Sequence, residues 1–421
     1  MSQALFLMGL LSGIMLFVCS LVAVSAPVTI RHIDWASPEM EAWLQESADQ
    51  FYKETGIKVE IELVPSSQVA ARLTVLLAGG VPPQTSWFLP ERLPQFRDVM
   101  IDLTPYIQRD NVKIESFAPG FVGNLYTAGA DAGTINALPV SLFTYAIAYN
   151  ENILGDAGLN APSTEWTWTD MIDYVRKTAL DTNSDGVIER PGLQMPIRWD
   201  RLGVLLHHAG GKWLNDVRNP TASLLLSEEV AQTLDFVAEL WQAGGANLKG
   251  IGDFYQGTAA FLFGASPNVP VELQKTLSDN VFNFRWQPFA KGPGENTGGE
   301  LEYQFYGIFK DAAHHEEAWQ WLKFLTARTE TQLRLAQTAH RIPAYQPAAI
   351  RYIKEIQASH PSVSVYMMQW EDPTSYTRPP WQPLTTLLNP WLVRAISTRD
   401  ISIREAMEQA HQLIEADLPN W

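Results

Sequence analysis

From residue 28 onward, segments with the pattern of a β-strand alternate with segments that have the periodicity of an α-helix. Residues 28–35 and 58–64 are predicted strands, whereas 38–54 and 66–78 are predicted helices that end at glycines. This alternation constrains the fold more than any other feature, because strands separated by helices are typical of mostly parallel sheets. The sequence therefore predicts an α/β architecture.

The length of the chain indicates two lobes rather than one. A chain of 421 residues is too long for a single compact core, and two lobes of about 150–200 residues each are expected. The apolar run 137–149 is long for one strand, so we expect it to pass from one lobe to the other. Further predictions are helices at 163–180 (with Thr169 capping the helix proper), 227–242, 313–327 and 403–417, and a glycine-rich loop at 291–299.

Composition narrows the possible partners. The net charge of -16 gives an acidic surface that repels phosphate backbones, which excludes nucleic acid as the expected partner. Aromatic residues make up 11% of the chain and include 15 Trp, more than a core of this size needs. Some of these rings are therefore expected to line a binding surface.

The N-terminal segment has the features of a signal peptide. An apolar run from residue 4 to residue 24 ends in Val24-Ser25-Ala26, so residues 1–26 are predicted to be removed on export. An uncleaved membrane anchor is the alternative, because no Lys or Arg precedes the run and Pro27 follows the cut. Cys19, the only cysteine, lies in this segment after Val18, where a lipidation site needs a small residue. The mature chain then has no thiol for catalysis or disulfides.

No pattern nominates a metal site, a cofactor or a catalytic residue. His207-His208 and His314-His315 are adjacent pairs that point apart on a helix, and no phosphate-binding loop or nucleophile elbow occurs. The loop 181–192 resembles the start of a calcium loop. It has Gly192 where the bidentate Glu belongs, so an Asx-rich turn is favoured. A glycoside hydrolase, which needs two facing carboxylates, is a distant alternative.

Several short motifs follow one another in a fixed order through residues 28–420. They are Phe51-Tyr-Lys-Glu-Thr-Gly-Ile-Lys-Val59, Leu77-Ala-Gly-Gly80, Asp102-Leu-Thr-Pro-Tyr-Ile107, Leu138-Pro139, Tyr149-Asn150, Ala209-Gly-Gly211, Phe254-Tyr-Gln-Gly257 and Ala318-Trp-Gln-Trp-Leu-Lys-Phe-Leu325. Each motif is unspecific alone, but the ordered set resembles the family 1 extracellular solute-binding proteins, the maltose-binding-like components of ABC importers.

This resemblance implies the periplasmic-binding-protein fold, with two α/β lobes, hinge crossings and a ligand in the cleft. The N-lobe would comprise residues 27–140 and 288–330, and the C-lobe residues 141–287 and 331–421. The implied function is that of a periplasmic monomer without enzymatic activity, which captures a carbohydrate and delivers it to an ABC permease in the inner membrane. The chain departs from the family at Gln84, Phe143 and Gly264-Ala-Ser266, where relatives often carry acidic residues or a tryptophan. These departures predict a less acidic cleft and leave the identity of the sugar open.

Candidate ligand residues follow from the chemistry of sugars, which have apolar C–H faces and a rim of hydroxyls. We expect aromatic platforms beside hydrogen-bonding groups where the resemblance places cleft loops, namely at Trp35, Glu39, Trp87, Phe88, Phe143, Trp199, Asp200, Ser266, Tyr303, Gln304, Arg341, Arg378 and Trp381. Trp166, Trp168, Trp319 and Trp321 lie in helical patterns and are predicted packing residues. Arg198, Arg341 and Arg378 could instead hold a phosphorylated or acidic solute such as a glycerol phosphate. Surface ion pairs are the other explanation for these arginines.

Overall fold

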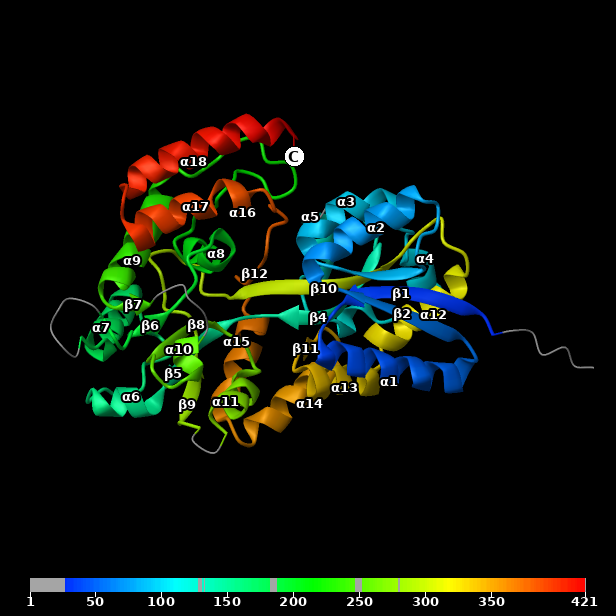
Figure 1. The fold of residues 1–421 in the computed structure, drawn as a ribbon, viewed down its shortest axis with the longest axis horizontal. Coiled ribbons are helices and arrows are strands. Elements are labelled where there is room, and N and C mark those ends of the chain that lie inside the picture. The colour runs from blue at the N-terminus through cyan, green and yellow to red at the C-terminus, as the bar shows by residue number, and fades with distance from the viewer. Residues whose placement is uncertain are drawn as a thin grey trace, which may run out of the picture.

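The computed structural model describes residues 27–127, 131, 133–181, 188–246, 252–278 and 281–420. Two lobes lie side by side along the longest axis, with the N-terminal strands in one and helix α18 in the other (Figure 1). The predicted signal segment and residues 182–187 of the 181–192 loop fall outside the described residues. Within the described part, no helix is long and apolar enough to span a bilayer.

Each lobe is built around its own sheet. The N-lobe sheet has seven strands in the order β11-β4-β10-β3-β1-β2, with β12 paired to β10 outside this path, and the C-lobe sheet has five in the order β7-β6-β8-β5-β9. The strands are β1 (Thr29–Trp35), β2 (Lys58–Val64), β3 (Thr85–Phe88), β4 (Ala137–Phe143), β5 (Ala146–Asn150), β6 (Leu193–Gln194), β7 (Gly245–Ala246), β8 (Phe261–Ala265), β9 (Phe284–Gln287), β10 (Glu300–Ile308), β11 (Ile342–Pro343) and β12 (Tyr376–Thr377).

The two-lobed α/β prediction is confirmed, but parallel and antiparallel pairs are mixed in both sheets. β1 runs parallel to β2 and β3, whereas β10 runs antiparallel to β3 and β4. In the C-lobe, β5 runs antiparallel to β8 and β9. The antiparallel pairs involve β4, β5, β9 and β10. These strands flank the passages of the chain between the lobes, so their direction is not set by a local strand–helix–strand unit.

Helices cover the faces of both sheets. Those of the N-lobe are α1 (Pro38–Thr55), α2 (Val69–Ala78), α3 (Leu93–Phe96), α4 (Thr104–Arg109), α5 (Phe121–Thr127), α12 (His315–Thr326), α13 (Thr329–Ala339) and α14 (Gln346–Gln357). Those of the C-lobe are α6 (Glu151–Asp156), α7 (Trp168–Thr178), α8 (Trp199–His208), α9 (Glu228–Gln242), α10 (Gly252–Tyr255), α11 (Val269–Leu277), α16 (Leu384–Leu387), α17 (Asn389–Leu392) and α18 (Ile403–Asp417).

Side-chain caps explain where several predicted helices begin. Ser37, Ser227 and Ser402 each accept a hydrogen bond from a backbone N–H of the first turn of α1, α9 and α18. For α7 the predicted cap, Thr169, is wrong. Thr167 caps this helix through a capping box with Asp170 at the third helical position, where a carboxylate can bond back to the cap's own N–H.

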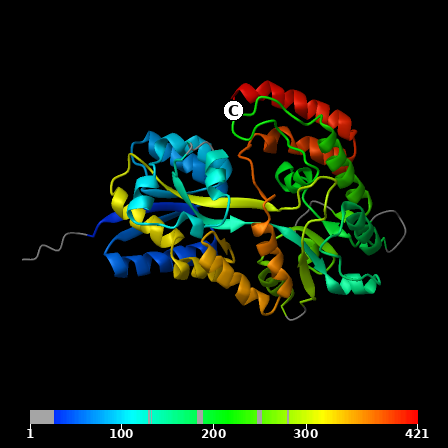
Figure 2. The ribbon, with the colours of Figure 1, turned by 180° about the vertical axis from the view of Figure 1, so that it is seen from behind.

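The chain passes between the lobes at three places in the described part. The first is the predicted one, because β4 ends in the N-lobe sheet and β5 begins the C-lobe sheet after Thr144 and Tyr145 alone. The second is the loop 288–299 between β9 and β10. The third follows α14 and includes α15 (Val365–Glu371), which stands between the two lobes when the molecule is seen from behind (Figure 2).

The expected lobe boundary at residue 331 differs from the structure. β11 pairs with β4 in the N-lobe sheet, and α13 packs against α1 and α14. The indole Nε1 of Trp43 in α1 donates to the carbonyl of Thr331 in α13 at 3.0 Å, which ties the two helices together in the N-lobe core. Residues 331–357 therefore extend the N-lobe, and the chain returns to the C-lobe only after α14.

The predicted packing tryptophans are confirmed. Trp319 and Trp321 in α12 are fully buried, and Trp166 is almost so. Trp168 stacks on Phe236, with ring centroids 4.1 Å apart and an interplanar angle of 5°. These rings contribute to the two cores and are not available to a ligand.

Candidate functional site

Two cavities lie where the lobes face each other. The first, called the Arg341 cavity here, has a volume of about 260 Å³ and is lined by Trp35, Ser37, Glu39, Leu142, Phe143, Thr144, Ser266, Pro267, Asn268, Glu272, Lys275, Ala339, His340, Arg341 and Ile342. The second, called the Trp199 cavity, has about 430 Å³. Its walls are Gly120, Gly123, Trp199, Asp200, Gly203, Leu206, His207, Gly211, Lys212, Trp213, Val217, Ser375, Tyr376, Thr377, Arg378, Pro379 and Trp381. Both cavities have walls from both lobes.

The guanidinium of Arg341 lies against two aromatic rings in the first cavity. Its Cζ is 4.5 Å from the ring centroid of Trp35, at the end of β1, and 4.5 Å from that of Phe143, at the end of β4. Among the described residues it makes no hydrogen bond and no ion pair. Burial lowers the pKa of Arg341 from its usual range. The rings therefore hold the guanidinium in place and leave its N–H groups available to a ligand.

One rim of the Arg341 cavity carries an ion pair between the lobes. Lys275 in α11 lies 3.5 Å from Glu39 in the first turn of α1 and 3.5 Å from Glu272 in its own helix. The backbone N–H of Glu39 itself, and then Lys275, lower the pKa of the Glu39 carboxyl. Because the pair joins a helix of one lobe to a helix of the other, it is made only while the lobes are close together.

A wall of aromatic and guanidinium groups begins at Phe143 of the Arg341 cavity. Phe143 stacks on Tyr145 with ring centroids 6.4 Å apart, and Tyr145 in turn packs under Arg201 of α8, whose Cζ is 3.9 Å from its centroid. The hydroxyl of Tyr145 lies 3.4 Å from Glu302. Phe143 ends β4 and Tyr145 lies in the first crossing, so the hinge segment itself forms part of this wall.

A buried network of charges lies beside this wall. Arg378 bonds through Nε to Glu300, its Nη2 lies 2.8 Å from Glu302, and its Nη1 is 3.9 Å from Asp200. Burial, followed by repulsion from Glu302, raises the pKa of Glu91 to about 7, although Arg378 acts in the opposite direction. One Oε of Glu91 is buried without a hydrogen-bond partner in the described chain. The network thus has more carboxyl groups than Arg378 can pair.

The indole groups of the Trp199 cavity are mostly bonded to the protein. Trp199 Nε1 donates to Thr385 Oγ1 at 3.2 Å, and Trp381 Nε1 donates to the carbonyl of Val217 at 3.0 Å. Trp213 Nε1 is buried without a partner among the described residues. The cavity is therefore walled by the faces of these rings, beside polar lining residues that include Lys212 and Thr377.

The predicted site residues separate into four groups. Trp35, Glu39, Phe143, Ser266 and Arg341 line the Arg341 cavity, and Trp199, Asp200, Arg378 and Trp381 line the Trp199 cavity. Trp87 and Gln304 are buried behind Trp35 and bond to each other at 3.1 Å. Phe88 and Tyr303 lie in the N-lobe core, where Phe88 packs on Phe96 and Phe309, and they line neither cavity.

Sequence reasoning missed the residues of the wall and of the buried charge network, namely Glu91, Tyr145, Arg201, Glu300 and Glu302. A signal was present for Glu300 and Glu302, which are charged residues in the otherwise apolar and aromatic run 300–308. Arg201 directly follows Asp200, which was expected to contact the ligand. The same expectation could have included Arg201. No local pattern marks Glu91, because its partners come from β10 and the segment after α15.

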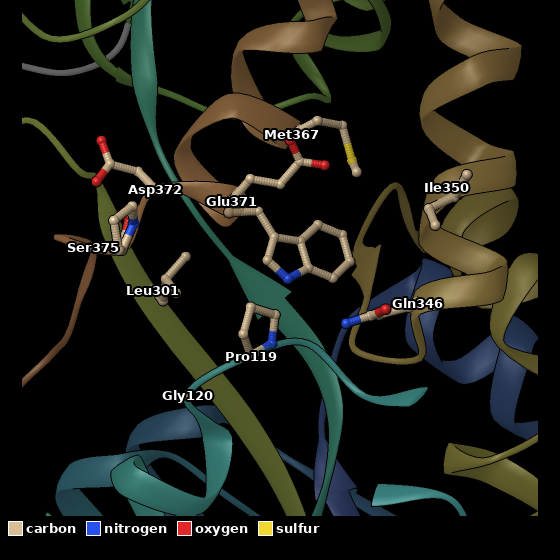
Figure 3. Close-up of a pocket in the computed structure, with 11 residues that line it drawn as sticks. Pro119, Gly120, Leu301, Gln346, Ile350, Met367, Glu371, Asp372 and Ser375 are labelled. Carbon is tan, nitrogen blue, oxygen red and sulfur yellow. The ribbon is translucent and has the colours of Figure 1, made fainter. Parts of the chain in front are cut away.

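A third cavity, of about 380 Å³, lies at the junction of the lobes beside α15. Met367, Glu371 and Asp372 border it on one side and Gln346 and Ile350 of α14 on the other (Figure 3). It includes none of the predicted ligand residues. Nor do the described residues include any cluster of His, Cys, Asp and Glu suited to a metal ion.

Two α/β lobes, three crossing segments and cavities between the lobes define the class of two-lobed solute-binding proteins. The family model described as bacterial extracellular solute-binding protein matches residues 36–332, more than half of the sequence. The chain belongs to this family. Membership in a family of binding proteins confirms the interpretation that the protein is not an enzyme. A comparison with curated protein sequences finds no match.

Solved structures agree with this assignment at the level of the fold. The ABC substrate-binding protein Lmo0181 from Listeria monocytogenes, in complex with cycloalternan, has a TM-score of 0.77 and 18% identity, over 93% of this chain and 99% of that one. The cyclic alpha-maltosyl-1,6-maltose binding protein from Arthrobacter globiformis has a TM-score of 0.77 and 16% identity, over 94% of this chain and 100% of that one. The sugar-binding protein MalE from Xanthomonas citri has a TM-score of 0.77 and 17% identity, over 93% of this chain and 98% of that one.

Proposed function

We propose that this protein binds a carbohydrate between its lobes in the periplasm and delivers it to an ABC permease of the inner membrane. The observation that carries the proposal is the Arg341 cavity. It combines the faces of Trp35 and Phe143 with a guanidinium free to donate and with the small polar side chains of Ser37, Thr144, Ser266 and Asn268. Aromatic faces beside hydrogen-bonding groups suit the two surfaces of a sugar ring.

Closure of the lobes is the step that the geometry supports. A ligand in the Arg341 cavity touches α1 and β1 from the N-lobe and the 266–275 segment from the C-lobe, so the full set of contacts exists only when the lobes approach. A ligand with differential affinity for the closed state shifts the population toward it. In this scheme the Glu39–Lys275 pair is one of the contacts made on closure.

The names of the structural relatives support a sugar over a phosphorylated or acidic solute, and so does the pairing of the arginines. Arg378 is already held by Glu300 and Glu302, and Arg198 by Asp200 at 2.9 Å. Of the three arginines considered for an anion, only Arg341 is without a carboxylate partner in the described chain. A phosphate site would need convergent free cations, whereas Lys275, which lines the same cavity as Arg341, is paired with Glu39 and Glu272.

A thermal-shift screen tests the proposal. Mature protein is heated with mono- and oligosaccharides, polyols and glycerol phosphates, and a bound ligand raises the melting temperature by mass action. We expect at least one saccharide to give a saturable shift that the variant Arg341→Ala loses. Shifts from glycerol phosphates alone would favour the anionic alternative. Slow hydrolysis of a glycoside without any stable binding would overturn the assignment as a binding protein.

A further inference from the structure

A second contact between the lobes lies beside the Trp199 cavity. The guanidinium of Arg218, in the C-lobe, lies over the ring of Tyr126 in α5 of the N-lobe, with its Cζ 4.5 Å from the ring centroid. The Nη2 of Arg218 is also 3.9 Å from the carboxylate of Asp131, which is almost fully exposed. Because solvent screens so exposed a carboxylate, the Tyr126 ring contributes more to this contact than Asp131 does.

The loop that carries Arg218 is held in shape by its own side chains. Residues 214–223, called the Arg218 loop here, begin and end in an antiparallel bridge. Asn215 Oδ1 accepts hydrogen bonds from two backbone N–H groups on the opposite side of the loop. Asp216 Oδ1 accepts from the N–H groups of Arg218 and Asn219, at 2.9 and 2.7 Å. The loop therefore loses little conformational entropy when Arg218 packs on Tyr126.

Two further hydrogen bonds fix the Arg218 loop to the rest of the C-lobe. Trp381 Nε1 donates to the carbonyl of Val217 at 3.0 Å, and the backbone N–H of Ser223 donates to the carboxylate of Glu415 in α18. Arg218 therefore moves with the C-lobe, whereas Tyr126, in α5, moves with the N-lobe. Opening of the cleft must break the contact between them.

The contact lies where the two walls of the Trp199 cavity approach each other. Gly123 of α5 lines this cavity from the N-lobe, and Val217 of the Arg218 loop lines it from the C-lobe. Tyr126 is three residues after Gly123, on the same face of the helix, and Arg218 directly follows Val217. The interlobe ion pair at the rim of the Arg341 cavity has the corresponding position there. Each cavity thus has a contact between the lobes beside it.

We propose that Tyr126 and Arg218 form a clasp that holds the two lobes together beside the Trp199 cavity. Neither residue lines this cavity or the Arg341 cavity, so the clasp acts through the equilibrium between open and closed lobes. This inference goes beyond the proposed function, because it concerns the closure of the lobes whichever solute is bound. A cation over an exposed aromatic ring typically changes an equilibrium constant about two- to fivefold.

Pulsed electron paramagnetic resonance between nitroxide labels on the two lobes tests the clasp. The mature protein, residues 27–421, has no cysteine, so labels attach only at the introduced cysteines of Val75→Cys in α2 and Leu413→Cys in α18. Both positions are exposed. Without ligand, Arg218→Met and Tyr126→Leu should each lower the ratio of the short-distance to the long-distance population about two- to fivefold. The double variant should lower it no further, because both changes remove the same contact.

Three controls separate the clasp from a general loss of structure. Tyr126→Phe keeps the ring and should keep the wild-type ratio of distances. Asp131→Asn removes only the screened carboxylate and should leave the ratio unchanged. Arg394→Met removes a guanidinium that lies over Trp391 within the C-lobe, and it should also leave the ratio unchanged. An unchanged ratio in Arg218→Met and Tyr126→Leu, or an equal loss in Tyr126→Phe, would overturn the proposal.

The same protein in the thermal-shift screen separates the clasp from the proposed function. If no saccharide binds but the distance ratio falls in Arg218→Met and Tyr126→Leu, the clasp stands and the carbohydrate assignment fails. If a saccharide binds and the ratio does not respond to these changes, the carbohydrate assignment stands and the clasp fails. Absence of both results contradicts both.

Discussion

The Arg341 cavity is lined by two Trp or Phe rings and the Trp199 cavity by four Trp or Tyr rings, and the two cavities leave different groups unpaired. In the first, the guanidinium of Arg341 rests on Trp35 and Phe143 and has no acceptor in the described chain. In the second, Arg378 is held by two glutamates and most indole N–H groups are bonded. The comparison teaches that aromatic content alone does not define a sugar site. What matters is whether the polar groups between the rings are still free.

The largest expected effect concerns the buried charge network around Arg378. Arg378→Met leaves the buried carboxyls of Glu300 and Glu302 without their cation, which typically costs about 3–5 kcal/mol in the free energy of unfolding. The control is Arg404→Met, whose guanidinium pairs with Glu408 at 2.9 Å with both side chains exposed, and it should cost no more than about 1 kcal/mol. Urea denaturation measures both. Equal costs would mean that the network does not stabilise the wall.

Removing a platform of the Arg341 cavity should affect binding more than folding. Trp35→Ala deletes one of the two rings that hold Arg341, and loss of an aromatic anchor typically costs about 2–3 kcal/mol, or roughly a hundredfold in affinity. Trp168→Ala is the control, because Trp168 stacks on Phe236 in the C-lobe. Calorimetry with the saccharide found in the screen should show wild-type affinity for the control. A loss in both variants would argue against a local effect.

Sequence predicted the lobes and the first crossing better than it predicted the site. Helices with regular periodicity and a serine cap, such as α9 and α18, began and ended close to their expected positions. The lobe boundary at 331 was wrong, since β11 is only two residues long and finds its partner, β4, about 200 positions earlier in the chain. In the sequence, Phe88 and Trp35 cannot be distinguished, because each is an aromatic residue at the end of a strand. Only the register of β3 against β10 buries the first in the core.

A smaller effect is expected in the pH dependence of stability, through Glu91 of the buried charge network around Arg378. The pKa of Glu91 is about 7 in the folded protein, against 4.5 for an ordinary glutamate. Between these values the folded state keeps a proton that the unfolded state has released, so the free energy of unfolding falls as pH rises from about 4.5 to 7. Glu91→Gln should match the wild type at pH 5 and be about 2 kcal/mol more stable at pH 8. Parallel stability curves for the two proteins would contradict this assignment.

The smallest effect is expected at the rim of the Arg341 cavity. Glu39→Gln removes the ion pair with Lys275. The side chains of Glu39 and Lys275 are 39% and 53% exposed, so solvent screens the pair and the free energy of unfolding should change by less than about 1 kcal/mol. Ligand affinity should fall by no more than about fivefold, and the difference should vanish at high salt. A large, salt-independent loss would instead identify Glu39 as a direct contact of the ligand.

Small-angle X-ray scattering of the mature protein, with and without a saturating saccharide, tests the central claim most directly. That claim is that the two lobes close around a carbohydrate held between Trp35, Phe143 and the 266–275 segment. The account predicts a smaller radius of gyration in the presence of the saccharide, and no change for Trp35→Ala at the same concentration. A saccharide that binds to the wild type without changing the radius of gyration would contradict it.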